Sequence, residues 1–274
     1  MKKLIALMMA LILMMSCSAA LAEDTSLADI QAKGKLVLGF DEAYPPMGFV
    51  DEETGEHIGF DIDLAKEVAE RMGVELVLQP IAWDSKELEL NNKNIDCIWS
   101  GMTITAQRQE QMLFSMPYLA NQQILVVRSG SGVDQFSELE GAVLGTQAGS
   151  ASVDVLEANE ELKAMVGEPM LYDDFVTALM DLQLGGIDVL LIDSVVGYYY
   201  IAQMEDPDNF FVMPEILQAE EYGIGFRLGD EALANEVNQQ LIAISNDGEL
   251  SEIVAKWFTE DTTTIAQYAN EYAK

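Results

Sequence analysis

A few charged side chains in this sequence could bind the two ends of a zwitterion. Arg108 lies three residues after Thr105, a good N-cap residue, so its guanidinium and the free N–H groups of one helix start can converge on a carboxylate. Asp193 follows the apolar run 189–192 and could pair with an ammonium group, or cap the helix expected from residue 194. Together they suit a small molecule that carries both groups.

The composition excludes several other kinds of site. The 274 residues include 14 Lys and Arg against 47 Asp and Glu, and this net charge of −33 excludes a general affinity for nucleic acid or anionic lipid. The single histidine, His57, argues against a His-rich metal site and a His-based catalytic triad. We therefore expect no cofactor, no metal and no catalytic residue, and the high charge favours a monomer.

The first 22 residues have the pattern of a signal peptide. Two lysines precede an uncharged apolar run at 4–15, which is shorter than the ~20 residues that span a bilayer. Residues 20–22 (Ala-Leu-Ala) form a small-x-small cleavage site, whereas residues 14–17 resemble a lipobox imperfectly, so a lipid anchor at Cys17 stays an alternative. Either route predicts an extracytoplasmic protein, periplasmic or at the cell surface. Cleavage after residue 22 leaves Cys97 alone, without a partner for an intrachain disulfide.

The remaining chain alternates short apolar runs with amphipathic stretches. Over residues 64–72 apolar side chains recur at helical spacing, with charged side chains outside the stripe, and apolar runs precede and follow this helix. Strand, helix and strand in this order are typical of an α/β fold with a largely parallel sheet. The strands are expected at 36–40, 76–78, 95–99, 124–127, 142–145, 189–192 and 224–226.

Two segments repeat one another in outline. Residues 90–96 and 182–188 each run from a leucine through a short turn to an Asp that opens an apolar strand. Ser100 follows the first of these strands, and Asp193 follows the second. Because ligands bind beyond the carboxyl ends of strands in open parallel sheets, these two residues mark a ligand site. The repeat predicts two similar lobes that face each other.

The heptapeptide at 59–65 (Gly-Phe-Asp-Ile-Asp-Leu-Ala) resembles the signature of the family 3 solute-binding proteins, the amino-acid receptors of ABC importers. Six further motifs match this family in order, at 41–46, 100–108, 147–151, 186–193, 222–227 and 247–258. The resemblance implies a two-lobed periplasmic-binding-protein type II fold with two hinge crossovers.

This fold divides the mature chain into a discontinuous lobe 1 and a continuous lobe 2. Lobe 1 would comprise residues 23–123 and 223–274, and lobe 2 would comprise residues 124–222. The crossovers would lie near 124–127 and 221–224, where Gly223 and Gly225 allow backbone rotation.

The resemblance also implies roles for individual residues. Arg108 would hold the ligand α-carboxylate, and Asp193 would hold its ammonium group. Tyr44 and Trp83 would sandwich the ligand side chain, unless they only pack the core, and Asp41 could pair with a basic side chain. The predicted ligand-binding residues are Asp41, Tyr44, Trp83, Ser100, Gly101, Met102, Thr103, Arg108, Gly149, Ser150 and Asp193.

These residues predict a receptor that binds a free L-amino acid, polar or basic, between two closing lobes. The receptor would deliver the amino acid to the membrane permease of an ABC importer. One alternative is a dehydratase-like enzyme on the same fold, which would need an acid or base beyond Asp193. A second alternative is a ligand-sensing module for a separate membrane partner.

Overall fold

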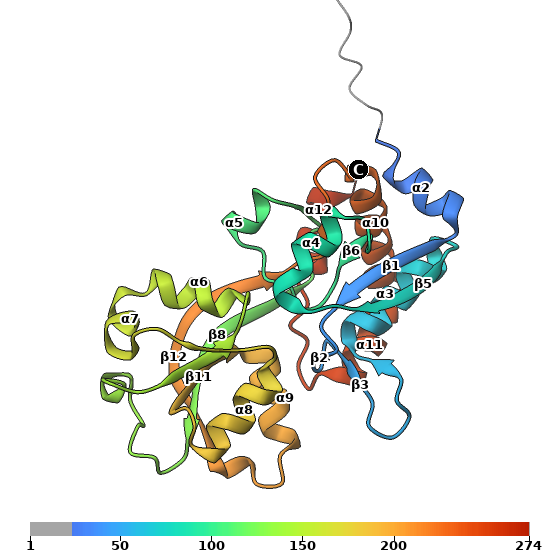
Figure 1. Cartoon of the computed structure of the whole chain (residues 1–274). Coiled ribbons are helices and arrows are strands. Elements are labelled where there is room, and N and C mark those ends of the chain that lie inside the picture. The colour runs from blue at the N-terminus through green and yellow to red at the C-terminus, as the bar shows by residue number, and fades with distance from the viewer. Residues whose placement is uncertain (1–23, 274) are drawn as a thin grey trace, which may run out of the picture.

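The computed structural model describes residues 24–273, which form two α/β lobes joined by two long strands (Figure 1). Each lobe contains a five-stranded sheet, with order β5-β1-β6-β13-β7 in lobe 1 and β10-β9-β11-β8-β12 in lobe 2. The predicted two-lobed α/β fold is therefore confirmed. The predicted signal peptide and the Cys17 anchor lie outside the described residues.

Lobe 1 combines the N-terminal and C-terminal parts of the chain. Its strands are β1 (Lys35–Phe40), β5 (Glu75–Pro80), β6 (Cys97–Ile98), β7 (Leu113–Phe114) and β13 (Gly225–Phe226), with a small sheet of β2 (Ala43–Tyr44), β3 (Gly48–Val50) and β4 (His57–Ile58). Its helices are α2 (Ser26–Lys33), α3 (Phe60–Arg71), η1 (Trp83–Ser85), α4 (Lys86–Asn91), α5 (Ala106–Gln109), α10 (Glu231–Asp247), α11 (Glu249–Trp257) and α12 (Ile265–Tyr272).

Lobe 2 is formed by the middle of the chain. Its strands are β8 (Leu119–Arg128), β9 (Leu144–Gln147), β10 (Met170–Tyr172), β11 (Val189–Asp193) and β12 (Phe210–Tyr222). Its helices are η2 (Phe136–Glu138), α6 (Ala151–Ala158), α7 (Glu160–Val166), α8 (Phe175–Leu184), α9 (Ser194–Gln203) and η3 (Pro207–Asn209).

One strand in each sheet runs against the other four, so the sheets are mixed rather than wholly parallel. These strands are β13 in lobe 1 and β8 in lobe 2. Each is the first strand that the chain forms after it crosses over from the other lobe, and it therefore runs away from the cleft. The other strands carry their carboxyl ends towards the cleft, where a ligand site is expected.

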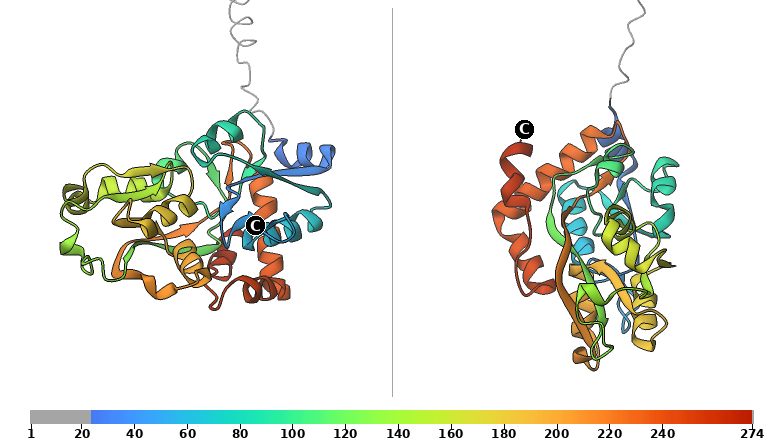
Figure 2. Two further views of the ribbon diagram at one scale, coloured as in Figure 1. Left: turned by 60° about the horizontal axis from the view of Figure 1, so that its bottom comes forward. Right: turned by 90° about the vertical axis from the view of Figure 1, so that its left-hand side faces the viewer.

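The two crossing strands pair with each other along their length. β8 and β12 are antiparallel from Arg128↔Phe210 to Leu119↔Tyr222, and the C-terminal segment adds hydrogen bonds to β8 beside the crossing. In the right-hand view of Figure 2 the red C-terminal helices lie alongside these strands. The predicted lobe boundary at 123/124 falls within β8, and the one at 222/223 falls at the end of β12. Both boundaries stay a prediction.

Gly223 and Gly225 allow neighbouring side chains to pack closely at the second crossing. Neither has a positive φ, but a Cβ at Gly223 would lie 2.8 Å from Ile104 Cδ1, and one at Gly225 would lie 2.9 Å from Met112 Sδ. The expected role in backbone rotation is therefore joined by a steric one.

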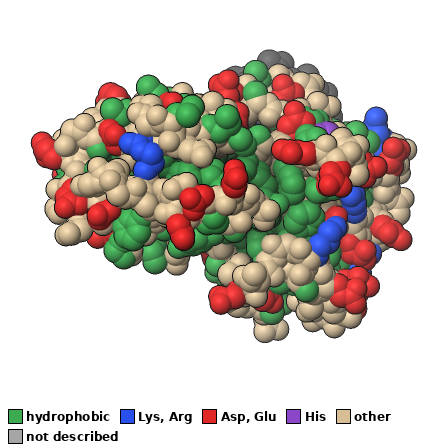
Figure 3. Space-filling model, turned by 90° about the horizontal axis from the view of Figure 1, so that it is seen from below, with side chains coloured by type: hydrophobic (Ala, Val, Ile, Leu, Met, Phe, Trp, Pro, Cys, Tyr) green, Lys and Arg blue, Asp and Glu red, His purple; other side chains and the backbone are tan. Residues whose placement is uncertain are grey.

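The core follows the apolar pattern of the sequence. On α3, Leu64, Ala65, Val68 and Ala69 are buried against lobe 1, and each fully buried large aliphatic side chain contributes roughly 1.5–3 kcal/mol. Cys97 is also buried, and burial raises the pKa of its thiol. No helix within residues 24–273 is long and apolar enough to cross a membrane. On the face seen in Figure 3, acidic side chains are spread over both lobes and basic side chains are few.

Candidate functional site

The turn after β6 is held in place by the signature heptapeptide. Gly101 has φ 54°, and its N–H donates to Asp61 Oδ2 at 2.7 Å. A Cβ at Gly101 would lie 2.6 Å from Tyr44 Cε1, so the turn requires glycine. Asp61 is fully buried, it also accepts the Tyr118 hydroxyl at 3.0 Å, and burial raises its pKa to about 7. The signature Asp61 therefore positions the turn.

Arg108 reaches across the cleft from lobe 1. As predicted, the Thr105 side chain caps α5 by accepting the Arg108 N–H at 3.1 Å. The guanidinium donates from Nη1 to Thr103 O at 2.9 Å and from Nη2 to Gly149 O in lobe 2 at 3.1 Å. Arg108 is buried, and both of its acceptors are neutral carbonyls, so a carboxylate would be a stronger partner.

Lys86 brings a second cation to the same carbonyl. Its side chain is 3% exposed, and Nζ donates to Gly149 O at 3.0 Å and to Trp83 O at 3.1 Å. Nζ also lies 4.7 Å from the Trp83 ring centroid and 3.3 Å from Glu87 Oε1. Burial, followed by repulsion from Arg108, lowers the pKa of Lys86 to about 8. Lys86 was not among the predicted site residues, because a lysine among alternating charged residues is typical of an exposed helix face.

Asp193 faces the site from lobe 2, where β11 ends. Its carboxylate accepts Gln123 Nε2 at 2.7 Å, Asn121 Nδ2 at 2.8 Å and Tyr222 Oη at 2.6 Å. It precedes α9, but its side chain makes no capping hydrogen bond there. Burial raises the pKa of Asp193. The carboxylate is thus directed into the interface between the lobes rather than onto the helix.

These residues enclose a very small cavity between the lobes. It measures about 10 Å³, roughly the room that one water molecule needs, so an amino acid can enter only if the lobes separate. The cavity is lined by Tyr44, Trp83, Gly101, Thr103, Arg108, Gln147, Ser150, Ala151 and Asp193. Seven of these were predicted, and the sequence analysis did not assign Gln147 and Ala151 to the site.

An acidic pocket of about 430 Å³ adjoins this cavity beyond Trp83. Asp41 is 7% exposed there, and its Oδ2 accepts Gln147 Nε2 of lobe 2 at 2.6 Å. Burial raises the pKa of Asp41, and Asp174 and Glu42 add to this shift. The pocket is lined by Asp41, Glu42, Ala43, Pro80, Ile81, Ala82, Trp83, Asp84, Ala148, Asp173 and Asp174. Five carboxylates and one indole ring suit a cationic group.

Three predicted residues lie outside both spaces. Ser100 Oγ accepts the Asp41 N–H at 3.1 Å and so positions Asp41. Met102 is fully buried in the core of lobe 1. Gly149 lines a neighbouring cavity of about 290 Å³ together with Lys86 and Arg108.

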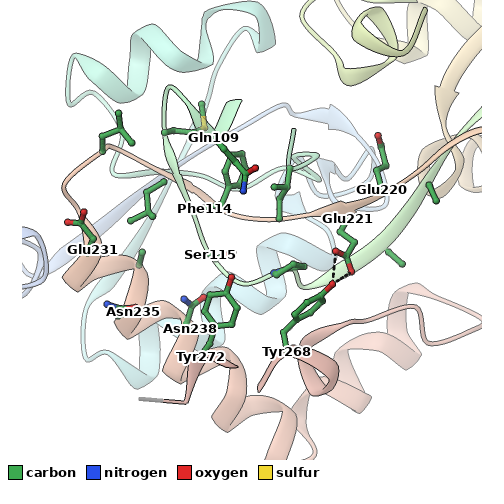
Figure 4. Close-up of a pocket in the computed structure, with 18 of the residues that line it drawn as sticks. Gln109, Phe114, Ser115, Glu220, Glu221, Glu231, Asn235, Asn238, Tyr268 and Tyr272 are labelled. Carbon is green, nitrogen blue, oxygen red and sulfur yellow. Dashed lines mark hydrogen bonds between the residues drawn. The ribbon is translucent and has the colours of Figure 1, made fainter. Parts of the chain in front are cut away.

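A larger cavity, about 980 Å³, lies behind the crossing strands and contains none of the predicted residues (Figure 4). Its wall includes Glu221, which accepts the Tyr268 hydroxyl. Size alone therefore does not identify the ligand site. Within residues 24–273 no group of three His, Cys, Asp or Glu side chains is arranged to hold a metal ion.

Known proteins resemble this chain over most of its length. The L-cystine-binding protein TcyJ of Escherichia coli (strain K12) is 30% identical over 244 residues, which cover 88% of this chain and 89% of that protein. The arginine-binding extracellular protein ArtP of Bacillus subtilis (strain 168) is 31% identical over 230 residues, covering 83% and 87%. These named relatives are binding proteins rather than enzymes.

A solved structure is similar to this chain over most of its length. It is an ABC uptake transporter substrate-binding protein from Streptococcus pneumoniae with bound histidine, with a TM-score of 0.85 and 38% sequence identity, covering 89% of this chain and 99% of that one. Residues 36–260 match the family described as bacterial extracellular solute-binding proteins, family 3. This chain therefore belongs to the bacterial extracellular solute-binding proteins of family 3.

Proposed function

We propose that this protein is an extracytoplasmic receptor that closes its two lobes around a free L-amino acid, polar or basic, and delivers it to an ABC importer. The observation that carries the proposal is the presence of both signs of charge in the cleft. Arg108 and Lys86 converge on the Gly149 carbonyl, and Arg108 and Asp193 line the same cavity. A zwitterionic α-amino acid carries the complementary pair of charges.

The acidic pocket favours a basic amino acid among these ligands. Asp41 stands at its inner end, and Trp83 lines both this pocket and the cavity. A ligand whose α-groups lie between Arg108 and Asp193 could direct a cationic side chain past Trp83 towards Asp41. The binding of arginine and histidine named for similar proteins supports this choice.

Closure would follow from the distribution of these groups between the lobes. Arg108, Tyr44 and Trp83 belong to lobe 1, so the ligand would bind lobe 1 first. Asp193 and the turn at Gly149 belong to lobe 2 and would close over it. Only the closed arrangement gives both charged ends of the ligand a partner, so the ligand stabilises closure through this difference in affinity.

The melting temperature of the refolded mature protein, measured against the twenty amino acids, tests the proposal. A ligand at ~100 times its dissociation constant stabilises the folded state by ~2.7 kcal/mol. We expect the largest shifts with basic amino acids and their loss in Arg108→Ala and Asp193→Ala. If none of the twenty shifts the melting temperature, the proposal fails, and product formation from dehydratase substrates becomes the next assay.

A further inference from the structure

Glu220 on β12 places a second carboxylate beside Asp193. Its Oε1 accepts Thr103 Oγ1 at 2.8 Å, Asn121 Nδ2 at 2.6 Å and Gln123 Nε2 at 2.8 Å. The same two amides also donate to Asp193, at 2.8 Å and 2.7 Å. Two acids therefore share one pair of neutral donors at the crossing between the lobes.

This pair of acids lacks a compensating positive charge. Glu220 is 9% exposed, and its Oε2 is buried without a hydrogen-bond partner among the described residues. Neither acid forms an ion pair within residues 24–273, although Arg108 lies near enough to lower the pKa of Asp193 slightly against the effect of burial. Burial, with repulsion from Asp193, raises the pKa of Glu220 to about 7. Two buried carboxylates this close cannot both ionise easily unless a cation joins them.

The neighbouring Glu221 shows how differently the next residue of the strand is placed. Figure 4 shows the Glu221 carboxylate bound to Tyr268 at the back of the crossing strands, and the two distances are 3.0 Å and 2.9 Å. Successive side chains of a strand point to opposite faces, so the Glu220 carboxylate turns away from Tyr268 towards Thr103, while Glu220 still lines part of the cavity drawn in Figure 4. Its partner Thr103 lines the small cavity between the lobes.

We propose that Glu220 and Asp193 act together as the site for the ligand's ammonium group, and that the pair holds a proton which the ammonium displaces. This inference rests on the proposed function. When the ligand binds, the O–H bond of the protonated carboxylic acid breaks and the proton leaves to solvent. The ligand's ammonium group then lies beside two carboxylates. Glu220 does not line the small cavity itself, so it acts on the ammonium through its negative charge and through the amides that it shares with Asp193.

The other groups around the pair do not supply this proton near neutral pH. Tyr44 and Tyr222 face it from β2 and β12, and burial raises the pKa of each well above 10. Asn121 and Gln123 on β8 are neutral amides, and Arg108 approaches from α5. Lys86, with a pKa lowered to about 8, and Asp41 titrate elsewhere in the cleft, and they are common to every variant compared below.

Calorimetric titration with arginine, in two buffers of different ionisation enthalpy, tests the exchange. Histidine is unsuitable because its own ring titrates in this range. For the wild type we expect release of about half a proton per site at pH 7, and affinity about tenfold weaker at pH 6 than at pH 8. Glu221→Gln is the matched control and should behave as the wild type, whereas Glu220→Gln should release fewer protons and lose most of this pH dependence.

The outcomes separate this inference from the proposed function. If the wild type binds arginine or another basic amino acid without releasing protons, or if Glu220→Gln releases as many, the acid pair is refuted and the receptor function stands. If the wild type binds no amino acid, both fail. Wild-type binding of arginine without proton release refutes the acid pair even if Glu220→Gln does not fold. Proton release is assigned to the pair only by comparison with Glu220→Gln, because Asp41 and Lys86 also titrate in the cleft.

Discussion

Replacement of Asp41 by asparagine tests whether the acidic pocket selects basic ligands. The substitution keeps the shape of the side chain, and its oxygen can still accept the Ala43 N–H, which now lies 2.9 Å from Oδ1. It removes the charge, and the loss of one partner from a buried charge pair costs about 2–5 kcal/mol. The lower bound corresponds to about 30-fold weaker binding of arginine. Glutamine has no side-chain charge, so its dissociation constant should change by less than about threefold, well under 1 kcal/mol.

The assay is calorimetry with both ligands at pH 7, and the readout is the ratio of the two dissociation constants. The ratio cancels effects on folding or closure that the two ligands share. Glu42→Gln is the control, since Glu42 lines the same pocket but is 50% exposed and pairs with His57 at 3.0 Å. Such an exposed charge contributes about 0–1 kcal/mol. An arginine-to-glutamine ratio that is the same in Asp41→Asn and the wild type would refute the selection by charge.

Three further predictions concern buried charges. Asp193→Asn should weaken the binding of every amino acid by about 30-fold or more in calorimetry. The control is Asp181→Asn, at another aspartate that accepts a tyrosine hydroxyl, and it should not weaken binding. Equal effects of the two substitutions would contradict the ammonium site. The pKa of Lys86 falls to about 8 on folding, so the folded state binds fewer protons than the unfolded state and gains up to ~3 kcal/mol of stability as pH rises from 8 to 10.5. Urea unfolding of Lys86→Met should lack this gain. If the unfolding free energy of Lys86→Met changes with pH as much as that of the wild type, the prediction is wrong. The pKa of Asp61 rises to about 7, so the wild type should lose up to ~4 kcal/mol of stability as pH rises from 4 through 7, and Asp61→Asn should show a flatter urea-unfolding profile.

Local spacing was enough to predict part of the fold and of the candidate site. The Thr105 cap of α5 and the apolar stripe of α3 depend on residues three or four positions apart, and the structure contains both. The motif at Asp61 indicated the family, but its structural role, a hydrogen bond that holds the turn at Gly101, 40 residues away, does not follow from local spacing.

The residues that the sequence analysis missed owe their positions to contacts between distant segments. The sequence around Lys86 is typical of an exposed helix, and only its hydrogen bond to Gly149, 63 residues away, shows that it lies in the cleft. Glu220 lies beside another acid in the sequence, and its burial depends on amides of β8 about 100 residues earlier. Such pairings follow from the approach of two lobes, which periodicity does not encode.

Most hydrogen bonds of the charges that face the cleft go to neutral groups, although Lys86 also lies 3.3 Å from Glu87 Oε1, and this arrangement explains how a ligand could drive closure. Arg108 and Lys86 share the Gly149 carbonyl, while Asp193 and Glu220 share two side-chain amides. Neutral partners satisfy the hydrogen bonds, but they recover only part of the hydration that a buried charge loses. An amino acid brings an opposite charge to both ends at once, where the low dielectric strengthens each attraction. Closure around the ligand therefore gains interactions that closure on the neutral groups alone cannot supply, and this difference couples binding to the movement of the lobes.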